Sequence, residues 1–207
     1  KSYRIPTFYD QYYSSPVEQG NPALKPEEAI TYEVGARYIK NGLAIEGNYF
    51  LRDATQLIDW VYNPADSIWR SQNFQNVVAQ GIELVLDVNF KEIVHAHFPL
   101  QLVTISYHFI DQELMQVEGV QSRYALENIR HQIISSIDHT VIGPIKNSFR
   151  FRYIDRVEQS PYYLIDDRLY FEGKQGYTVF IEAANLTNQT YTEVMTPMPG
   201  RWIRGGI

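Results

Sequence analysis

The sequence predicts an all-β protein whose antiparallel, up-and-down strands are of the kind that form a transmembrane β-barrel. Three observations lead to this prediction. Apolar and polar residues alternate with a period of two over long runs, most clearly at residues 76–90. Short and long connections alternate along the chain. The chain also holds 16 Tyr, 10 Phe and 3 Trp, residue types that favour strands and interfaces over helical bundles.

Composition excludes several other classes of protein. With 44% hydrophobic and 20% charged residues, the 207-residue chain is not disordered in bulk. The net charge is −6 and the basic residues are dispersed, which argues against a nucleic-acid partner. The absence of Cys excludes disulfide scaffolds, thiol catalysis and cysteine metal sites. No apolar run approaches the roughly 20 residues that a membrane helix needs.

The first elements are a loop and a hairpin. Residues 1–26 are rich in proline and tyrosine, and prolines at that density forbid a central strand, so we expect an irregular loop. Residues 31–38 then alternate, with Tyr32 and Val34 on one face and Glu33 on the other. Asn41-Gly42 is a strong hairpin signal, and the chain returns as a second alternating strand over residues 43–52.

A polar and aromatic loop over residues 61–75 separates this hairpin from the clearest strand, at residues 76–90. One face of that strand is apolar, with Val85 as the exception on the other face. The apolar residues are Ile82, Leu84, Leu86, Val88 and Phe90, and the polar residues between them are Glu83, Asp87 and Asn89.

The remaining chain continues the same pattern. Strands are predicted at residues 103–109, 130–141 (a weaker pattern), 149–153, 162–171 and 177–184, with a last half-strand at 201–207. Tight turns are expected near Glu92, at Gly143-Pro144 and at residues 173–176. Long connections are expected at residues 111–128, 157–161 and 186–199. About nine strands result, with short turns at one end and long loops at the other, as in outer-membrane barrels.

In such a barrel the apolar face meets lipid and the polar face meets the lumen. The expected lumen residues are Glu33, Arg37, Glu46, Arg52, Glu83, Arg150 and Arg152. A soluble β-sandwich also alternates apolar and polar residues, so a soluble all-β domain is the alternative. The length of the strands favours the barrel, because soluble strands run to about five or six residues.

Several motifs resemble those of the TonB-dependent outer-membrane receptors. Asn-Pro-Ala-Leu-Lys-Pro-Glu at residues 21–27, followed by Tyr-Glu-Val-Gly at 32–35, is similar to a barrel motif of that family. So are Tyr-Phe-Leu-Arg-Asp at 49–53, Leu-Ile-Asp-Trp at 57–60 and Gly-Ile-Glu-Leu at 81–84. Near the end, Asn-Leu-Thr-Asn-Gln-Thr-Tyr at 185–191 and Pro-Gly-Arg-Trp at 199–202 resemble the family's last motifs. The matches follow the family's order, and the strand spacing is most similar to that of cobalamin-receptor-type members.

The resemblance implies a fold and a function. Residues 1–207 would be the C-terminal part of a barrel of roughly 22 strands, without the plug domain and the N-terminal strands. The whole receptor would use TonB to energise uptake of a scarce nutrient at the outer membrane of a Gram-negative cell. Cobalamin is the preferred ligand and a ferric siderophore the next. Implied partners are the TonB complex through the missing plug segment, the small-molecule nutrient, outer-membrane lipid and, as a further candidate, a surface lipoprotein. The alternative is a soluble all-β binding or adhesion domain for a glycan or protein ligand.

Aromatic residues on the long loops are the candidate ligand contacts, because flat side chains bury area at little entropic cost. These candidates are Tyr12, Tyr13, Tyr62, Trp69, Tyr124 and Tyr162. The competing interpretation places half or more of them in the aromatic girdle at the membrane interface, where we also expect Trp60 and Trp202.

No catalytic or metal site is expected. The chain has no phosphate loop, H-E-x-x-H or G-x-S-x-G motif, so we predict no enzyme and no cofactor. His95 and His97 would share a strand face but have no evident third ligand. Asp166 and Asp167 would point to opposite faces of a strand, which makes a shared calcium ion unfavourable. The Asn-x-Thr runs at Asn185 and Asn188 are interpreted as turn chemistry.

Overall fold

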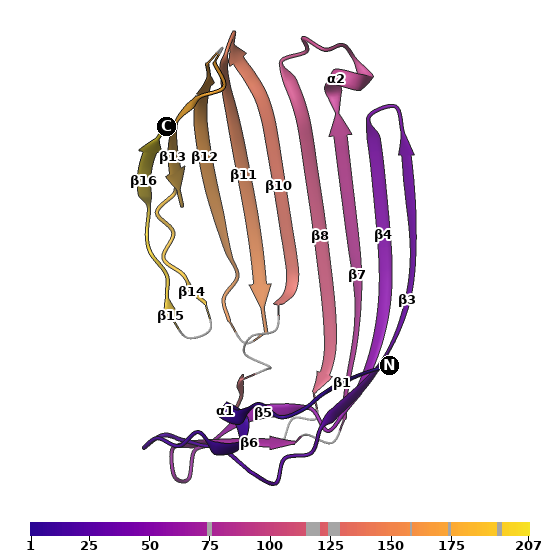
Figure 1. The fold of residues 1–207 in the computed structure, drawn as a ribbon, viewed down its shortest axis with the longest axis vertical. Coiled ribbons are helices and arrows are strands. Elements are labelled where there is room, and N and C mark those ends of the chain that lie inside the picture. Colours follow the sequence, from indigo (N-terminus) through magenta and orange to yellow (C-terminus); the bar gives the residue numbers. More distant parts are fainter. Residues whose placement is uncertain (74–75, 115–120, 124–128, 158, 174, 194–195) are drawn as a thin grey trace.

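A ten-stranded antiparallel sheet dominates the protein, in the order β1-β3-β4-β7-β8-β10-β11-β12-β13-β16. In the computed structural model, residues 1–73, 76–114, 121–123, 129–157, 159–173, 175–193 and 196–207 are described. The strands stand side by side as an open wall, with β3 near one edge and β16 at the other (Figure 1). Their bounds are β1 (Ser2–Arg4), β3 (Glu27–Lys40), β4 (Leu43–Thr55), β7 (Asn76–Asn89), β8 (Leu100–Leu114), β10 (Ile129–Ile142), β11 (Ile145–Arg156), β12 (Tyr162–Glu172), β13 (Thr178–Ala184) and β16 (Trp202–Gly206).

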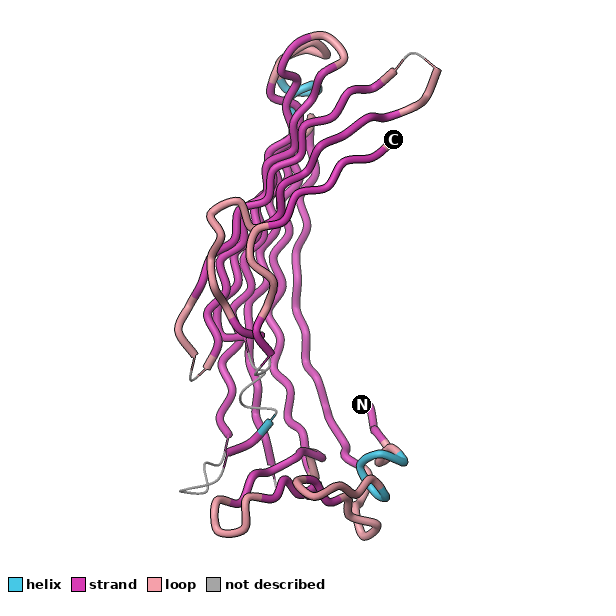
Figure 2. The backbone as a smooth tube through the Cα atoms, turned by 90° about the vertical axis from the view of Figure 1, so that its left-hand side faces the viewer, coloured by secondary structure: helices cyan, strands magenta, loops and turns pink. Residues whose placement is uncertain are grey.

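Short turns join the long strands at one end of this wall, and longer connections gather at the other (Figure 2). Asn41 and Gly42 both have positive φ, 48° and 79°, as a two-residue hairpin requires. The turn between β7 and β8 holds the helix α2 (Phe90–Ile93), because the Asn89 side chain accepts the Lys91 backbone N–H at 3.2 Å. The prediction that Phe90 continues the β7 strand is therefore wrong. Among the described residues, no helix is long and apolar enough to cross a bilayer.

The two faces of the wall differ as the alternation predicts. The register of β4, β7 and β8 aligns Tyr49, Ile82 and Phe109 on one face, which we call the outer face. It leaves large apolar side chains exposed, for example Val34 at 68% and Ile181 at 55%. Exposure of an apolar face of this extent to water is unfavourable, and such a face marks a membrane or interaction surface. A polar exception is Asp167, whose carboxylate accepts a hydrogen bond from Asn147 at 2.8 Å.

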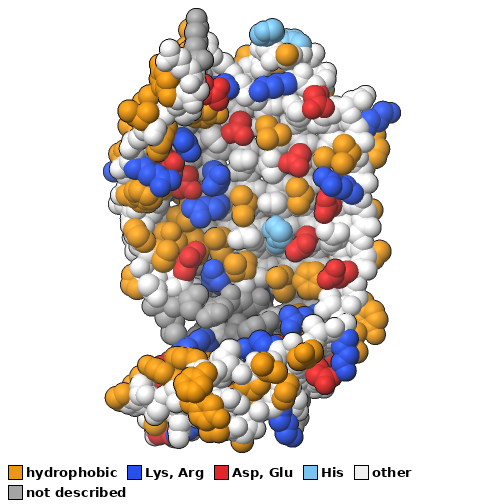
Figure 3. Space-filling model, in the orientation of Figure 1, with side chains coloured by type: hydrophobic (Ala, Val, Ile, Leu, Met, Phe, Trp, Pro, Cys, Tyr) orange, Lys and Arg blue, Asp and Glu red, His pale blue; other side chains and the backbone are white. Residues whose placement is uncertain are grey.

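The opposite, inner face carries charged residues over β3 to β16, and all seven predicted lumen residues lie there (Figure 3). Neighbouring strands pair these charges. The nitrogen–oxygen distances are 3.3 Å for Arg37–Glu46, 2.9 Å for Arg152–Asp166 and 2.7 Å for Arg204–Glu182. A ring nitrogen of His108 lies 3.6 Å from the Glu83 carboxylate. Trp202 pairs with Ala184 in this same phase. Its predicted place in a lipid-facing aromatic girdle is wrong, because Ile203 takes the outer position on β16.

Gly81 allows the backbone of β7 to lie close to the neighbouring strands of the wall. A Cβ atom at Gly81 would lie 2.5 Å from the Phe109 carbonyl oxygen and 2.5 Å from the Phe50 ring. Gly81 thus permits the close backbone contact that its place in a strand predicts.

A second, four-stranded sheet of order β2-β6-β5-β9 lies at the loop end. It consists of β2 (Glu18–Gln19), β5 (Ile58–Asn63), β6 (Ile68–Asn73) and β9 (Gln121–Ser122), and the helix α1 (Phe8–Tyr12) lies beside it. We call α1 and these four strands the loop unit. Residues 1–26 and 61–75 were predicted as irregular loops, and the structure corrects this. The alternation of apolar and polar residues did not indicate β5, because residues 58–61 are buried on both faces of the strand and do not alternate.

Candidate functional site

Asp10 is the centre of the loop unit. Thr7 caps α1, with reciprocal bonds between the Thr7 and Asp10 side chains and backbones. The Trp60 indole N–H donates to the Asp10 carboxylate at 3.1 Å, and an Arg4 nitrogen lies 3.6 Å from it. Asp10 is only 7% exposed. Burial alone would raise the pKa of Asp10, but the bonds from Thr7 and Trp60 and the charge of Arg4 outweigh it, and the pKa is lowered.

This lowered pKa predicts acid sensitivity of the loop unit. The stabilisation from ionised Asp10 is complete above the ordinary carboxyl pKa of about 4 and is lost as the pH falls below it through the folded value. We expect pepsin to cleave residues 1–27 of the folded receptor increasingly below about pH 4. Asp10→Asn should expose this segment at every pH, at a cost of about 1–3 kcal/mol.

The matched control is Asp66→Asn, on the exposed turn between β5 and β6. The pKa of Asp66 is also lowered, by its hydrogen bonds from Arg70, yet the pair lies in water and contributes little to stability. Cleavage of the unaltered receptor that does not change with pH would contradict the role of Asp10.

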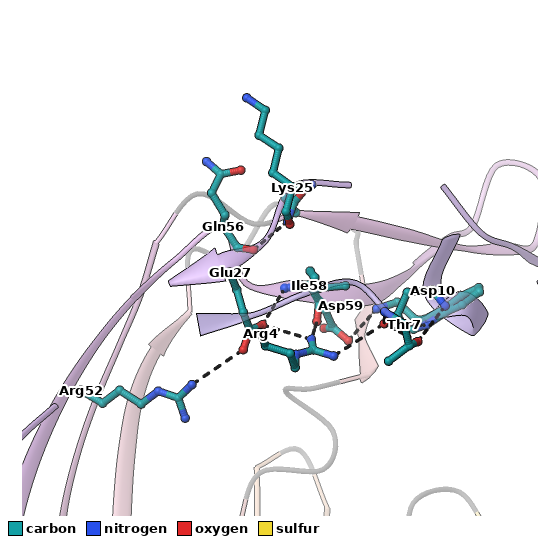
Figure 4. Close-up of polar contacts among 11 residues, drawn as sticks. Arg4, Thr7, Asp10, Lys25, Glu27, Arg52, Gln56, Ile58 and Asp59 are labelled. Atoms are coloured by element: carbon teal, nitrogen blue, oxygen red, sulfur yellow. Dashed lines mark hydrogen bonds and ion pairs between the residues drawn. The ribbon is translucent and has the colours of Figure 1, made fainter. Parts of the chain in front are cut away.

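Glu27 joins the loop unit to the wall (Figure 4). Its buried carboxylate accepts the Ile58 backbone N–H at 3.2 Å and an Arg4 N–H at 3.1 Å. On its other side, an Arg52 nitrogen on β4 lies 3.9 Å away. Asn73 bonds the backbone of Lys25 in both directions, at 2.9 and 3.0 Å. The run at residues 21–27 therefore positions the loop unit on the sheet.

Arg123 brings the β8–β10 connection onto the same unit. Its guanidinium donates to Glu18 at 2.8 Å and lies 5.0 Å from the Trp69 ring centroid and 5.7 Å from that of Trp60. Burial would lower the pKa of Arg123, but the bond and charge of Glu18 raise it overall. The strand pairing of β9 with β5 holds this contact in place.

Three of the sequence-predicted ligand contacts lie in the loop unit, and a fourth, Tyr13, directly follows α1. Tyr12 is exposed and packs on Phe8, with ring centroids 5.0 Å apart. Tyr13 stacks on Tyr9 at 4.4 Å, and Tyr62 and Trp69 form a cross-strand pair at 5.3 Å. Tyr124 lies outside the described residues.

Two other aromatic residues are more buried than the pattern indicates. Trp60 is 5% exposed in the core of the loop unit, so its predicted place in the girdle is wrong. Tyr162 is also 5% exposed and packs with Ile154 and Leu164, and its hydroxyl donates to Glu193 at 2.6 Å. It lies under the Tyr191 ring, at a centroid distance of 4.7 Å, away from the loop unit's aromatic pairs.

We describe two of the cavities on the surface of the described residues. One, of about 420 Å³, is lined mostly by the acidic and basic residues of β10 to β16 on the inner face. The other, of about 510 Å³, lies at the loop end between the β11–β12 connection, the segment after β13 and Gln121. Sequence reasoning missed the second cavity, because its lining comes from separate segments.

The other sequence-predicted polar sites are structural. His95 and His97 are exposed in the turn after α2, not on a strand as predicted. Asp166 bonds Arg152 while Asp167 bonds Asn147, so the two aspartates point to opposite faces as expected. The described residues contain no group of three metal-ligating side chains. Asn185 and Asn188 both have positive φ, which confirms turn chemistry at these positions.

A family model for the TonB-dependent receptor-like β-barrel matches residues 1–186. The chain belongs to the TonB-dependent receptor family. It is therefore part of an outer-membrane barrel, and the soluble all-β alternative is wrong. The family is one of receptors and transporters, not enzymes.

Individual proteins are similar to the chain in sequence or in fold. The vitamin B12 transporter BtuB of Vibrio vulnificus is 33% identical over 82 residues, which are 40% of this chain and 13% of that protein. The copper transporter OprC superposes with a TM-score of 0.75 at 12% identity, over 98% of this chain and 35% of its own. The FrpB iron transporter of Neisseria meningitidis gives 0.67 at 14% identity, over 91% and 32%. The siderophore receptor PirA of Pseudomonas aeruginosa gives 0.66 at 17%, over 97% and 33%. The structural matches establish the fold alone, and the chain spans about a third of the length of these three solved structures.

Proposed function

We propose that residues 1–207 are the C-terminal part of the barrel of a receptor that takes up a scarce nutrient with energy from TonB. Cobalamin is the preferred ligand and a ferric siderophore the next. The observation that carries the preference is the 33% identity to a vitamin B12 transporter over 82 residues. The loop end, with its aromatic loop unit and a cavity of about 510 Å³, is consistent with ligand capture from outside the cell.

In this proposal the loop end faces the medium and the short-turn end faces the periplasm. The ligand binds the loops and the plug, and the TonB complex then pulls on the plug to open a path. No bond of the ligand is made or broken. Tyr12, Tyr13, Tyr62 and Trp69 supply flat surfaces for the ligand, and Tyr124 and Tyr162 are the further candidates.

The two faces of the wall have matching roles. The outer face would lie in outer-membrane lipid, and the paired charges of the inner face, such as Arg152 and Asp166, would face the plug. A surface lipoprotein is a candidate partner for the exposed aromatic side chains of the loop unit, such as Phe8.

The test is uptake by the complete receptor. The full-length gene would be expressed in a Gram-negative strain that lacks its own cobalamin receptor, with and without TonB. We expect saturable uptake of radiolabelled cobalamin that falls to background without TonB. If cobalamin has no affinity but a ferric siderophore is taken up, the preferred ligand is wrong. A product that fractionates with soluble proteins would overturn the receptor assignment itself.

A further inference from the structure

The outer face of the wall carries a group of polar side chains on three neighbouring strands. His139 on β10 lies directly opposite Asn147 on β11. The Asn147 amide donates to the Asp167 carboxylate on β12 at 2.8 Å. All three side chains are half-buried, so the chain itself leaves part of each uncovered. We call these three residues the outer polar patch.

The outer polar patch lies inside the apolar part of this face and not at its border. Toward the short turns, the outer phase of the strands continues with apolar residues, namely Ile145, Phe171 and Val179. Toward the loop end it continues with Ile137, Phe149, Phe151 and Ile165. The patch is therefore a polar island in a surface that otherwise suits lipid.

The outer face of the preceding strands has no such island. At residues 32–38, 43–51, 82–88 and 103–109, the outer phase holds aliphatic, aromatic and glycine residues. The polar group on β10 to β12 is thus a local feature of one part of the wall, which calls for a local explanation.

The hydrocarbon of a membrane offers no water to complete the hydrogen bonds of these side chains. A carboxylate has two acceptor oxygens, but among the described residues only the Asn147 amide bonds that of Asp167. The described part of the chain likewise gives the His139 ring no hydrogen-bond partner. Ionisable side chains at membrane depth pair with other protein groups. The outer polar patch therefore needs a covering surface that supplies both a donor and an acceptor.

We propose that the outer polar patch is the contact between two copies of the receptor in the outer membrane. The patch is self-complementary, because an imidazole N–H donates and a carboxylate accepts. A two-fold axis along the membrane normal brings the same patch of two copies together, as in other closed dimers. His139 of each copy then donates to Asp167 of the other, and apolar neighbours such as Phe149 and Leu169 pack around the pair. The contact does not depend on which nutrient the receptor takes up.

Disulfide cross-linking of the full-length receptor in outer membranes tests this contact. Leu169→Cys places a thiol beside the patch, because Leu169 pairs with Asn147 and is 40% exposed. In a receptor otherwise free of cysteine, we expect oxidation with copper–phenanthroline to give a covalent dimer. Leu84→Cys is the matched control, since Leu84 is 47% exposed on the outer face of β7, and this variant should remain monomeric.

Substitutions in the patch test its chemistry in the Leu169→Cys background. Asp167→Leu should lower the cross-linked fraction about tenfold or more, because both symmetry-related bonds to a carboxylate are lost. The heat-modifiable mobility of the barrel should be retained. Asp167→His alone leaves two rings and no carboxylate, and should also lower cross-linking. Adding His139→Asp exchanges donor and acceptor, and should restore the dimer.

The alternative occupants give different results. If Leu169→Cys stays monomeric like Leu84→Cys, the patch faces lipid and the inference is overturned. A cross-linked product whose mass is not that of two receptors shows another membrane protein on the patch, which overturns the second copy. A dimer that persists at full yield in Asp167→Leu overturns the role of the polar side chains. Uptake of radiolabelled nutrient by the unaltered receptor decides the proposed function separately.

Discussion

A receptor carrying Leu84→Arg is expected to accumulate poorly as a folded barrel, whereas Val85→Arg is expected to fold. The two residues are neighbours on β7, and the register directs Leu84 to the outer face with Tyr107 and Val85 to the inner face with Ser106. An arginine near the middle of the lipid face costs about 2–4 kcal/mol. At Val85 it would lie beside Glu46, which is paired with that position across β4 and β7.

The folded fraction is measured by heat-modifiable mobility in outer-membrane extracts, and the stability by urea unfolding of the barrel in lipid vesicles. Equal effects of the two substitutions would contradict the assignment of faces. A larger loss of folded barrel in Val85→Arg than in Leu84→Arg would reverse the assignment of the two faces.

Asn185→Val is the second substitution for which we expect a large effect. Asn185 is 4% exposed, and its side chain makes two 2.8 Å bonds to Gln189 and a longer one, at 3.4 Å, to the Pro199 carbonyl. Its φ of 51° lies in the left-handed region, which is unfavourable for a β-branched residue. Lost bonds and backbone strain together should cost about 3 kcal/mol or more.

Asn185→Gly is the matched control, because glycine keeps the backbone conformation and loses only the side-chain bonds. We expect it to be intermediate in stability. Hydrogen exchange of the amides in residues 186–193 would report the change. Indistinguishable exchange in the valine and glycine variants would show that backbone strain at this position is unimportant.

The long strands were predictable because each of their faces meets a single environment. In β7 the alternation of Ile82, Glu83 and Leu84 directly encodes an outer and an inner face. Asn41-Gly42 likewise encodes a turn through backbone conformation alone. The β5 strand gave no such signal, because Ile58, Asp59 and Trp60 are all buried between α1, β6 and the wall.

The site was predictable only in part. Tyr12, Tyr13, Tyr62 and Trp69 lie at the loop end in three separate ring pairs, in segments that the sequence analysis predicts as long connections. The pattern could not distinguish a surface aromatic residue from a buried one, which is why Trp60 was misplaced. It also could not reveal the loop-end cavity, whose described lining comes from three separate segments of the chain.

The barrel assignment predicts that accessibility to lipid alternates from one residue to the next along β7. Because the sequence has no Cys, single cysteines can be introduced at residues 82–88 of the full-length receptor and spin-labelled in lipid. We expect collisions with oxygen, which concentrates in the bilayer, to be high at residues 82, 84, 86 and 88 and low at 83, 85 and 87. Uniform accessibility along the strand, or high oxygen accessibility at the odd-numbered positions, would contradict a lipid-facing outer wall.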